Sequence, residues 1–254
     1  MKAIVPVDDA LVWRDVPDPV PAAGEALLRV RAAGVNRADL VQRAGRYPPP
    51  PGTSEILGLE VAGEVVSAPD GSGWKRGDRA CALLAGGGYA ERVTVPHRML
   101  MPVPERLSFD QAASLPEVHL TAFLNLFLEA GLRAGERLLV HGGASGVGTA
   151  AIQQARRAGA RVATTSSAPK RDACRALGAE LALDRRDPAW PARLRDAWDG
   201  VDVILDMVGA DTSAAAFELL DTGGRLVWIA ALSGSRLEID VRTLMRGRLT
   251  LKGS

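Results

Sequence analysis

The stretch that most constrains the fold is residues 138–155, LLVHGGASGVGTAAIQQA. A short apolar run, Leu138–Val140, predicts a buried strand, and the Ala-rich run Val147–Ala158 has the spacing of a helix. Between them Gly146 and Gly148 are expected to let the backbone turn sharply and approach a ligand without a Cβ in the way. The predicted helix has a stripe of small side chains that lets it lie close on a sheet, formed by Val147, Ala151, Ala155 and Ala158.

From about Leu115 onward, strand-like and helix-like segments alternate. One helix is predicted over Pro169–Leu177, with proline in its first turn. Another is predicted to begin with Asp211 as its N-cap and to stop before Gly223–Gly224. The predicted strands are Arg137–His141, Arg161–Thr165, Glu180–Leu183, Val201–Leu205, Arg225–Ala230 and Leu249–Lys252. Such alternation is typical of an open, doubly wound parallel sheet covered by helices on both faces.

The part of the chain before about residue 115 has a different pattern. Short apolar segments are separated by glycine and proline, as in EALLRVRAAGV and LGLEVAGEVVSA. Frequent turn signals between short strands predict a β-rich domain, a small barrel. We therefore expect an α/β protein of two domains, residues 1–116 and 117–254.

A glycine turn that follows a strand and opens a helix is typical of a phosphate-binding site, because the helix N-terminus offers free N–H groups and a partial positive charge. Here the spacing through Gly142, Ser145 and Gly148 is G-x-x-S-x-x-G, a variant of the usual dinucleotide motif. The alternative is a tight connection without a ligand. The residues predicted to contact a pyrophosphate are Ala144, Ser145, Gly146, Val147 and Gly148.

The next strand end bears on which dinucleotide would bind. NAD-binding sheets place an acidic residue about 20 residues after the glycines. No carboxylate lies between Arg161 and Arg171, and Ser166, Ser167 and Lys170 suit a 2′-phosphate instead. NADPH is thus favoured over NADH, the alternative being a solvated turn with a helix cap. Because ligands lie beyond the carboxyl ends of the strands, further contacts are predicted at Val208, Gly209, Ala230, Ala231 and Leu232.

Together the segments VNRADLVQRAGRYPPPPG (35–52), ILGLEVAGEV (56–65), GDRACALLAGGGYAE (77–91), LVHGGASGVGTAAIQ (139–153) and DVILDMVG (202–209) resemble the medium-chain dehydrogenase/reductase superfamily. Within it they are most similar to the zinc-free NADPH:quinone oxidoreductases, in the branch of the p53-inducible quinone oxidoreductase. The resemblance implies a GroES-like catalytic domain followed by a Rossmann domain, with the active site in the cleft between them.

The same resemblance implies a homodimer that pairs the sixth Rossmann strand, Leu249–Lys252, across two subunits. In the family the chain continues beyond this strand and returns to complete the catalytic domain, whereas this sequence stops at Ser254. Either the sequence is a truncated chain, or the protein lacks the returning segment, in which case the cleft is incomplete and activity is in doubt.

Residue identities argue for chemistry without a metal. Zinc-dependent relatives have a cysteine where this sequence has Asn36 and a histidine at Leu59, between Gly58 and Glu60. A catalytic zinc needs three protein ligands, and a structural site usually needs four from cysteine and histidine. The chain has two cysteines, and its three histidines lie far apart in sequence, so structural or surface roles are expected for His97, His119 and His141, and a core position for Cys81.

Hydride transfer without zinc requires orientation of the acceptor and a proton donor. The phenol of Tyr47 stays protonated at neutral pH and can donate to a developing oxyanion; the alternative is packing on Pro48–Pro51. The resemblance implies that Tyr47 and Asn36 face nicotinamide and substrate, with Asn36 orienting a cofactor or substrate oxygen, although a turn-stabilising role is the alternative. It also suggests Thr121, while Arg185 suits adenine stacking or the 2′-phosphate.

Composition narrows the function further. The 254 residues have a formal net charge of +1 and only 4% aromatic residues, which disfavours nucleic-acid binding. The most apolar long segment, Leu115–Ala130, contains charged side chains, so a cytoplasmic protein without a membrane span is expected. The leading hypothesis is an NADPH-dependent quinone reductase acting on a small molecule. Reduction of an activated C=C bond in an enal, enone or enoyl thioester, and NADPH binding without turnover, remain alternatives.

Overall fold

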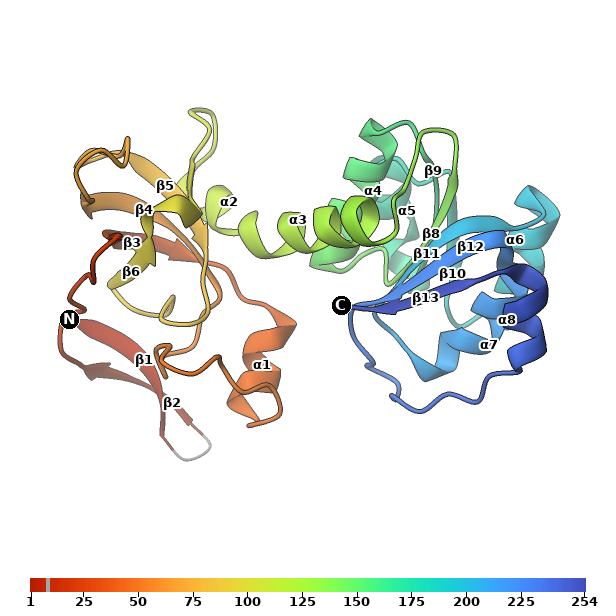
Figure 1. Cartoon of the computed structure of the whole chain (residues 1–254), viewed down its shortest axis with the longest axis horizontal. Helices are drawn as coiled ribbons and strands as arrows, with labels where there is room; N and C mark the ends of the chain where they lie inside the picture. The colour runs from red at the N-terminus through yellow and green to blue at the C-terminus, as the bar shows by residue number, and fades with distance from the viewer. Residues whose placement is uncertain (8–9) are drawn as a thin grey trace. The chain divides into compact units, whose positions relative to one another are not determined.

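Figure 1 shows the computed structural model, which describes residues 1–7 and 10–254. The contacts within the chain divide it into two compact units, Met1–Glu117 and Val118–Ser254, called unit 1 and unit 2 below. The division falls inside helix α3 (Pro116–Phe123), one residue after the boundary expected from the sequence.

Unit 1 is built from β-strands. Its main sheet is antiparallel with the strand order β6-β3-β4-β5-β7. The bounds of these strands are Glu25–Ala33 (β3), Glu60–Ser67 (β4), Arg79–Leu83 (β5), Arg92–Pro96 (β6) and Leu100–Pro102 (β7). A separate antiparallel pair joins β1 (Lys2–Val7) to β2 (Ala10–Asp15). The β-rich first domain predicted from the turn signals is therefore confirmed, and it has the GroES-like antiparallel half-barrel form.

The alternating apolar residues of these strands fill two small cores. One core lies around Leu28, Val61 and Val95, which are almost fully buried. The second includes Cys81, as expected, with the short helix α2 (Phe109–Ala113) packed over it. Helix α1 (Arg37–Arg43) follows directly after Asn36. A single 3₁₀ turn, η1 (His97–Met99), connects β6 to β7.

Unit 2 contains a six-stranded sheet in which every neighbouring pair is parallel. The strand order β10-β9-β8-β11-β12-β13 is the 3-2-1-4-5-6 order of a Rossmann sheet. The strands are Arg137–His141 (β8), Arg161–Ser166 (β9), Leu181–Asp184 (β10), Val201–Asp206 (β11), Leu220–Trp228 (β12) and Thr250–Gly253 (β13). The doubly wound sheet predicted from the sequence is confirmed.

Helices cover both faces of this sheet, so its strands carry apolar residues on both sides. After α3 and the π-helical turn η2 (Leu124–Glu129), the helices of unit 2 are α4 (Gly146–Arg157), η3 (Ala168–Lys170), α5 (Arg171–Ala176), α6 (Trp190–Trp198), α7 (Ala210–Leu219) and α8 (Val241–Gly247). Leu138 and Val140 of β8 pack against α4 and α5, whereas Leu139 between them packs against α6 and α7. The predicted small-residue stripe of α4 packs into the core through the buried Ala151 and Ala155.

One predicted helix boundary is wrong. Asp211 is not the N-cap of its helix, because Gly209 precedes α7 and Asp211 lies in the first turn. The helix stops before Gly223–Gly224, as predicted, and it ends at Leu219 because Leu220 already pairs with Val201 and draws the chain into β12. The helix predicted over Pro169–Leu177 is divided into a 3₁₀ turn, η3, and the short helix α5.

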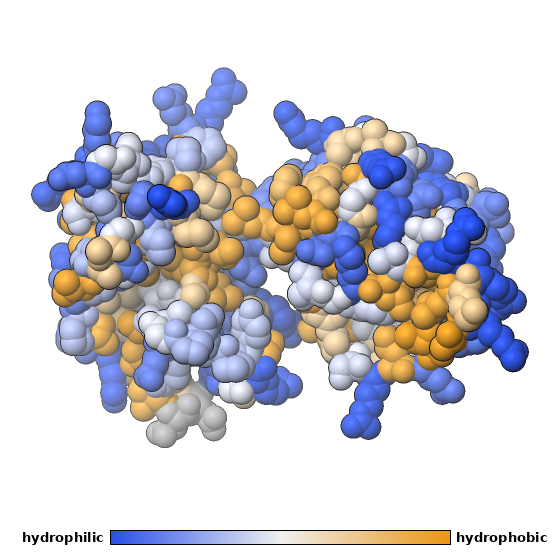
Figure 2. All heavy atoms as spheres, viewed as in Figure 1, coloured by the Kyte–Doolittle hydropathy of each residue, from blue (hydrophilic) through white to orange (hydrophobic). Residues whose placement is uncertain are grey.

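The segment from α3 into the π-helical turn η2 (Leu124–Glu129) exposes several large apolar side chains. They appear as orange spheres over this segment in Figure 2 and comprise Leu120, Phe123, Leu124 and Leu128. No helix among residues 1–7 and 10–254 is long and apolar enough to cross a membrane.

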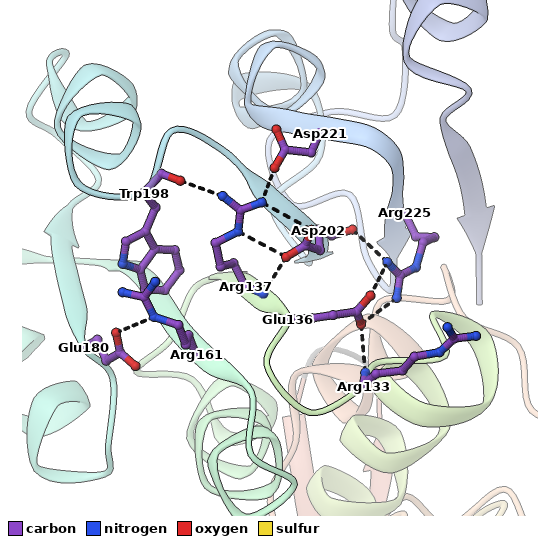
Figure 3. Close-up of polar contacts among 9 residues, drawn as sticks. All are labelled: Arg133, Glu136, Arg137, Arg161, Glu180, Trp198, Asp202, Asp221 and Arg225. Atoms are coloured by element: carbon purple, nitrogen blue, oxygen red, sulfur yellow. Dashed lines mark hydrogen bonds and ion pairs between the residues drawn. The ribbon is translucent and has the colours of Figure 1, made fainter.

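Charged side chains gather where the strands of unit 2 begin (Figure 3). The guanidinium of Arg137 bonds the Asp202 carboxylate, with Nε to Oδ2 at 3.2 Å, and its Nη1 donates to the Trp198 carbonyl at 2.6 Å. Arg137 also forms an ion pair with Asp221. Hydrogen bonding and charge attraction from Arg137 outweigh the effect of burial and lower the pKa of Asp202. Because each bond joins different strands or helices, this network fixes strand register at the amino ends.

We expect Arg137→Met to lower the free energy of unfolding by about 2 kcal/mol, because it leaves the partly buried Asp202 carboxylate without its cation. Urea denaturation would measure the change. The matched control is Arg193→Met, which removes an exposed pair with Asp187 and should change stability by less than about 0.5 kcal/mol. Equal losses of unfolding free energy in the two variants would show that the Arg137 network stabilises the fold no more than an exposed ion pair does.

Candidate functional site

The glycine turn at the carboxyl end of β8 is closed by contacts within the turn itself. The positive φ of +72° lies at Gly142, and not at Gly146 or Gly148, both of which are in the first turn of α4. The prediction that these two glycines make the sharp turn is therefore wrong. A Cβ on Gly148 would lie 2.3 Å from the Gly142 carbonyl oxygen, so this glycine is needed for the helix to approach the turn.

The start of α4 leaves several backbone donors without a partner. Ser145 is the N-cap of the helix, and its Oγ accepts from the Gly148 N–H at 3.0 Å. Among the hydrogen bonds of the described residues, none uses the N–H groups of Ala144, Gly146 or Val147. Unpartnered N–H groups at a helix N-terminus suit an anion. Of the five residues predicted here, three thus offer free donors, while the Ser145 hydroxyl and the Gly148 N–H are already bonded to each other.

The segments that follow β11 and β12 are held against each other at the carboxyl end of the sheet. The buried Asp206 carboxylate at the end of β11 accepts from the N–H groups of Val208 and Gly209. Gly209 has a φ of +93°, and a Cβ there would lie 2.6 Å from the Gly234 carbonyl oxygen. The segment after β12 therefore lies directly against Val208–Gly209. The structure places the predicted residues Ala230, Ala231 and Leu232 in that segment, at the same sheet edge as the glycine turn.

The residues predicted for a 2′-phosphate lie at the ends of β9 and β10. Ser166 pairs in register with Asp184, and the N–H of Arg185 donates to the Ser166 carbonyl at 2.8 Å. Ser166 is only 4% exposed, so its hydroxyl is poorly placed to meet a ligand. Ser167 is half-buried, while Lys170 and Arg185 are exposed, and no bond among the described residues engages the ammonium or the guanidinium.

Thr121 lies in α3, at the start of unit 2. It is partly buried, and its carbonyl accepts from the Asn125 side chain at 2.8 Å. Its hydroxyl has no hydrogen bond within the part of the chain that the structure describes, so it is available to a ligand. The role predicted for Thr121 stays a prediction.

Unit 1 holds a separate polar centre around Asn36. The Asn36 Nδ2 donates to Glu60 Oε1 at 2.8 Å, and the Asn36 backbone N–H donates to Asp39 Oδ2 at 2.7 Å. Glu60 Oε2 accepts from the Glu117 N–H at 2.9 Å, and the Tyr89 hydroxyl donates to Asp39 Oδ2 at 2.8 Å. Asn36 is thus held through both its side chain and its backbone.

The carboxylates of this polar centre are shielded from water. Glu60 and Asp39 are each 2% exposed. Burial raises the pKa of Glu60, while hydrogen bonds from Asn36 and from the Glu117 backbone act in the opposite direction. Burial, followed by the nearby Glu60 and Asp39 charges, raises the pKa of Glu117. Burial and the bond to Asp39 also raise the pKa of Tyr89 above its usual range.

Sequence reasoning predicted a role for Asn36 but did not name the residues that hold it. Asp39 lies three residues after Asn36, at the spacing of a helix capping box, which was the available signal. No local pattern points to Glu60 or Tyr89, because strand pairing and loop packing bring Glu60 to Asn36 from 24 residues away and Tyr89 to Asp39 from 50 residues away.

Tyr47 lies in the segment that joins α1 to β4 and is 53% exposed. Its hydroxyl has no hydrogen bond among the described residues, so nothing in unit 1 occupies the proton that it is predicted to donate. The catalytic role of Tyr47 stays a prediction.

Potential metal ligands do not cluster in the described parts of the chain: no three His, Cys, Asp or Glu side chains there are placed to hold an ion. The three histidines lie in different surroundings. His97 Nδ1 lies 2.8 Å from the Gly24 carbonyl, and His119 receives a bond from Gln154. His141 is fully buried, with Nδ1 at 2.9 Å from the Thr165 hydroxyl.

Each of the two units matches a known protein family. Residues 22–105 match the alcohol dehydrogenase GroES-like domain, and residues 146–254 match the zinc-binding dehydrogenase family. Quinone oxidoreductase of Rattus norvegicus is 35% identical over 244 residues, covering 94% of this chain and 74% of the relative. Other curated relatives are longer: the chain spans 9% of the polyketide synthase system protein NorB of Streptomyces orinoci and 52% of the rat VAT-1 homolog.

Solved structures of oxidoreductases are also similar to this chain over its whole length. Quinone oxidoreductase of Thermus thermophilus, solved alone and with NADPH, is 37% identical with a TM-score of 0.83, over 100% of this chain and 80% of that one. The CurK enoyl reductase is 27% identical with a TM-score of 0.87, over 100% and 80% of the two chains. A GroES-like unit followed by a Rossmann sheet defines a class of oxidoreductases. The chain belongs to the medium-chain dehydrogenase/reductase superfamily.

The buried His141 gives stability a pH dependence. Burial lowers the pKa of His141 to about 4, despite the attraction of the nearby Asp206, whereas an unfolded histidine titrates near 6.5. Between these two pH values the unfolded chain binds the proton and the folded chain does not. The stabilising contribution of the neutral ring is therefore complete above about pH 6.5 and is lost as the pH falls toward 4.

We expect wild type to lose more thermal stability than His141→Gln between pH 7.5 and 4.5, because glutamine does not titrate. Melting temperatures across this range would measure the two slopes, and His97→Gln is the matched control, expected to follow wild type. Parallel profiles for wild type and His141→Gln would contradict this assignment.

Proposed function

We propose that the chain is the NADPH-binding and catalytic part of a zinc-independent reductase that transfers a hydride from NADPH to a quinone. The observation that carries the proposal is the start of α4, where the N–H groups of Ala144, Gly146 and Val147 have no partner among the described residues, beside a turn closed by Gly142 and Gly148. Backbone donors in this arrangement fit a pyrophosphate.

The adjacent sheet edge supports NADPH over NADH. Lys170 and Arg185 are exposed cations near the end of β9, with the half-buried Ser167 between β9 and Lys170. No carboxylate follows the last residue of β9 before Asp172. Ionic contacts from Lys170 and Arg185 would hold a 2′-phosphate. The structure of a quinone oxidoreductase solved with NADPH, 37% identical to this chain, supports the same choice.

NADPH supplies the hydride when it is bound. The residues of the chain bind the cofactor, orient the acceptor and donate a proton to it. Val208, Gly209 and the 230–232 segment provide a rigid backbone edge beside the glycine turn. The Tyr47 phenol, which has no hydrogen bond within the described part of the chain, can donate to an oxyanion. The amide of Asn36, held by a carboxylate, orients an oxygen of cofactor or substrate. An amide and an aliphatic side chain stand where zinc-dependent relatives have ligands, so the proposed reaction uses no metal.

A second candidate acceptor is an activated C=C bond, in an enal, enone or enoyl thioester. The likeness to the CurK enoyl reductase favours it. Both reactions need a hydride and a proton donor, so they differ in the shape of the substrate site and not in the residues assigned here. The quinone is preferred because two quinone oxidoreductases are 35% and 37% identical to this chain.

We also propose that two copies of the chain pair through β13. This strand is at the edge of the six-stranded sheet, with one side of its backbone unpaired within unit 2. Light scattering would show a mass of twice the 26.8 kDa of the chain.

The proposed function is tested by following NADPH and NADH oxidation in the presence of a chelator, with an ortho-quinone, a para-quinone and an enoyl thioester offered in parallel. NADPH-specific turnover of a quinone is expected. Turnover of the thioester alone would establish the second candidate, and NADPH binding without any turnover would indicate a binding protein. Activity that the chelator abolishes would contradict the zinc-free mechanism.

Lys170→Ala should weaken NADPH binding about tenfold, or about 1.4 kcal/mol, because it removes one cation from the 2′-phosphate. NADH binding should not change, since NADH lacks that phosphate. Fluorescence titration with both cofactors measures the difference. Lys75→Ala removes an exposed lysine from a turn of unit 1 and serves as the control. If Lys170→Ala weakens both cofactors equally, Lys170 does not recognise the phosphate.

Tyr47→Phe should lower kcat by a factor of about 100, in the range for loss of a general acid. The dissociation constant for NADPH should change by less than about twofold, because Tyr47 lies in unit 1 and the phosphate donors lie in unit 2. Steady-state rates and cofactor titration measure the two effects separately. Unchanged turnover would remove Tyr47 from the mechanism.

A further inference from the structure

We propose that Glu60 is a positioning residue, whose buried carboxylate fixes the amide of Asn36 in one orientation so that Asn36 presents one N–H donor to an oxygen of cofactor or substrate. The inference rests on the proposed function, in which Asn36 contacts the reacting molecules. It concerns which end of the Asn36 amide faces the reacting molecules and which residue determines that orientation.

The direction of the amide follows from what Glu60 can do chemically. An ionised carboxylate only accepts hydrogen bonds, so the Asn36 group facing Glu60 Oε1 at 2.8 Å is the NH₂ group and not the carbonyl. The other end of the amide belongs to the capping box at the start of α1, where the Asn36 side chain faces the Asp39 N–H. One of the two Nδ2 protons is used by Glu60, which leaves the second as the donor that Asn36 can offer.

The Glu60 carboxylate is itself held in place. Its second oxygen accepts from the Glu117 N–H at 2.9 Å. The space occupied by Oε1 exists because residue 34 is glycine: a Cβ there would lie 2.0 Å from this oxygen. Asp39, held by Tyr89, fixes the Asn36 backbone from the other side. Asn36 therefore has little freedom to rotate or to exchange the ends of its amide.

Stability does not explain why this side chain is charged. Glu60 is 2% exposed and forms no ion pair with a cation among the described residues. A buried carboxylate without a cation costs free energy, and a glutamine of the same shape would avoid most of that cost. The negative charge does, however, decide the orientation of Asn36, because a carboxylate can accept from both the Glu117 N–H and the Asn36 NH₂ group, whereas a neutral amide has only one acceptor oxygen.

The substitution Glu60→Gln separates the effect of the Glu60 charge on stability from its effect on the orientation of Asn36. The Glu117 N–H requires an acceptor and will hold the glutamine carbonyl oxygen, so the glutamine NH₂ group will face Asn36. Two NH₂ groups cannot bond each other, and Asn36 must then turn its carbonyl toward the new amide or lose the contact. We expect kcat to fall at least tenfold, with NADPH affinity within about twofold of wild type and a melting temperature equal or higher.

Glu64→Gln is the matched control. Glu64 lies on the same strand, β4, and pairs with Arg31 at 3.1 Å on the exposed side. The substitution removes the same charge without contacting Asn36, so kcat should not change. An equal fall in kcat for Glu64→Gln and Glu60→Gln would show a general charge effect and overturn the inference.

A double-mutant cycle with Asn36→Ala identifies the route by which Glu60 acts. If Glu60 works through Asn36, Glu60→Gln should cause no further loss of kcat in the Asn36→Ala background. The same fold loss in both backgrounds, or wild-type activity of Glu60→Gln, would overturn the inference. A merely structural role would instead lower the melting temperature and affect both backgrounds equally.

The orientation of Asn36 can also be followed without turnover. In amide spectra of protein labelled with ¹⁵N at asparagine, the NH₂ resonances assigned with Asn36→Ala should shift in Glu60→Gln and remain in place in Glu64→Gln. Unshifted resonances would contradict the inference. If wild type reduces none of the acceptors, the proposed function fails, but this spectrum still decides whether Glu60 fixes the amide.

Discussion

The contact between the first turn of α4 and the glycine turn before it is the constraint on which unit 2 depends. Gly148 lies so close to the Gly142 carbonyl that any side chain there would overlap it. This close approach brings the small-residue face of α4 against β8 and β9, with Ala151 and Ala155 buried. It also directs the helix N-terminus to the carboxyl end of the sheet. The same packing therefore stabilises the sheet and sets out the backbone donors that we propose bind a phosphate.

The polar centre of unit 1 follows a different principle. Its buried carboxylates, Asp39 and Glu60, are balanced by N–H and O–H donors from Asn36, Tyr89 and Glu117, and no cation among the described residues pairs with them. Hydrogen bonds are directional, whereas an ion pair tolerates many geometries. Such a network costs free energy through burial, but it holds one amide side chain in a defined position.

Sequence patterns were sufficient where neighbouring residues determine the structure. The apolar strands and the Gly-rich turn predicted the parallel sheet and the place of α4, because periodicity and turn chemistry are local. They were insufficient where distant backbones compete. Leu220 leaves α7 because it pairs with Val201, and Gly148 is needed because of the Gly142 carbonyl. The other residues of the polar centre were also missed, since Glu60 reaches Asn36, and Tyr89 reaches Asp39, only through strand pairing and loop packing.

The two edges of the parallel sheet differ in how their charged and donor groups are partnered. At the amino ends, Arg137 pairs with Asp202, while Arg225 pairs with Glu136 and donates to the Asp202 carbonyl, and these bonds fix strand register (Figure 3). At the carboxyl ends, charged or donor groups such as Lys170, Arg185 and the first N–H groups of α4 have no partner among the described residues. A cation or donor that is already bonded within the protein has less to gain from a ligand, because binding must first break the existing bond. Register therefore has to be fixed at the amino edge if the carboxyl edge is to keep its donors available for a phosphate.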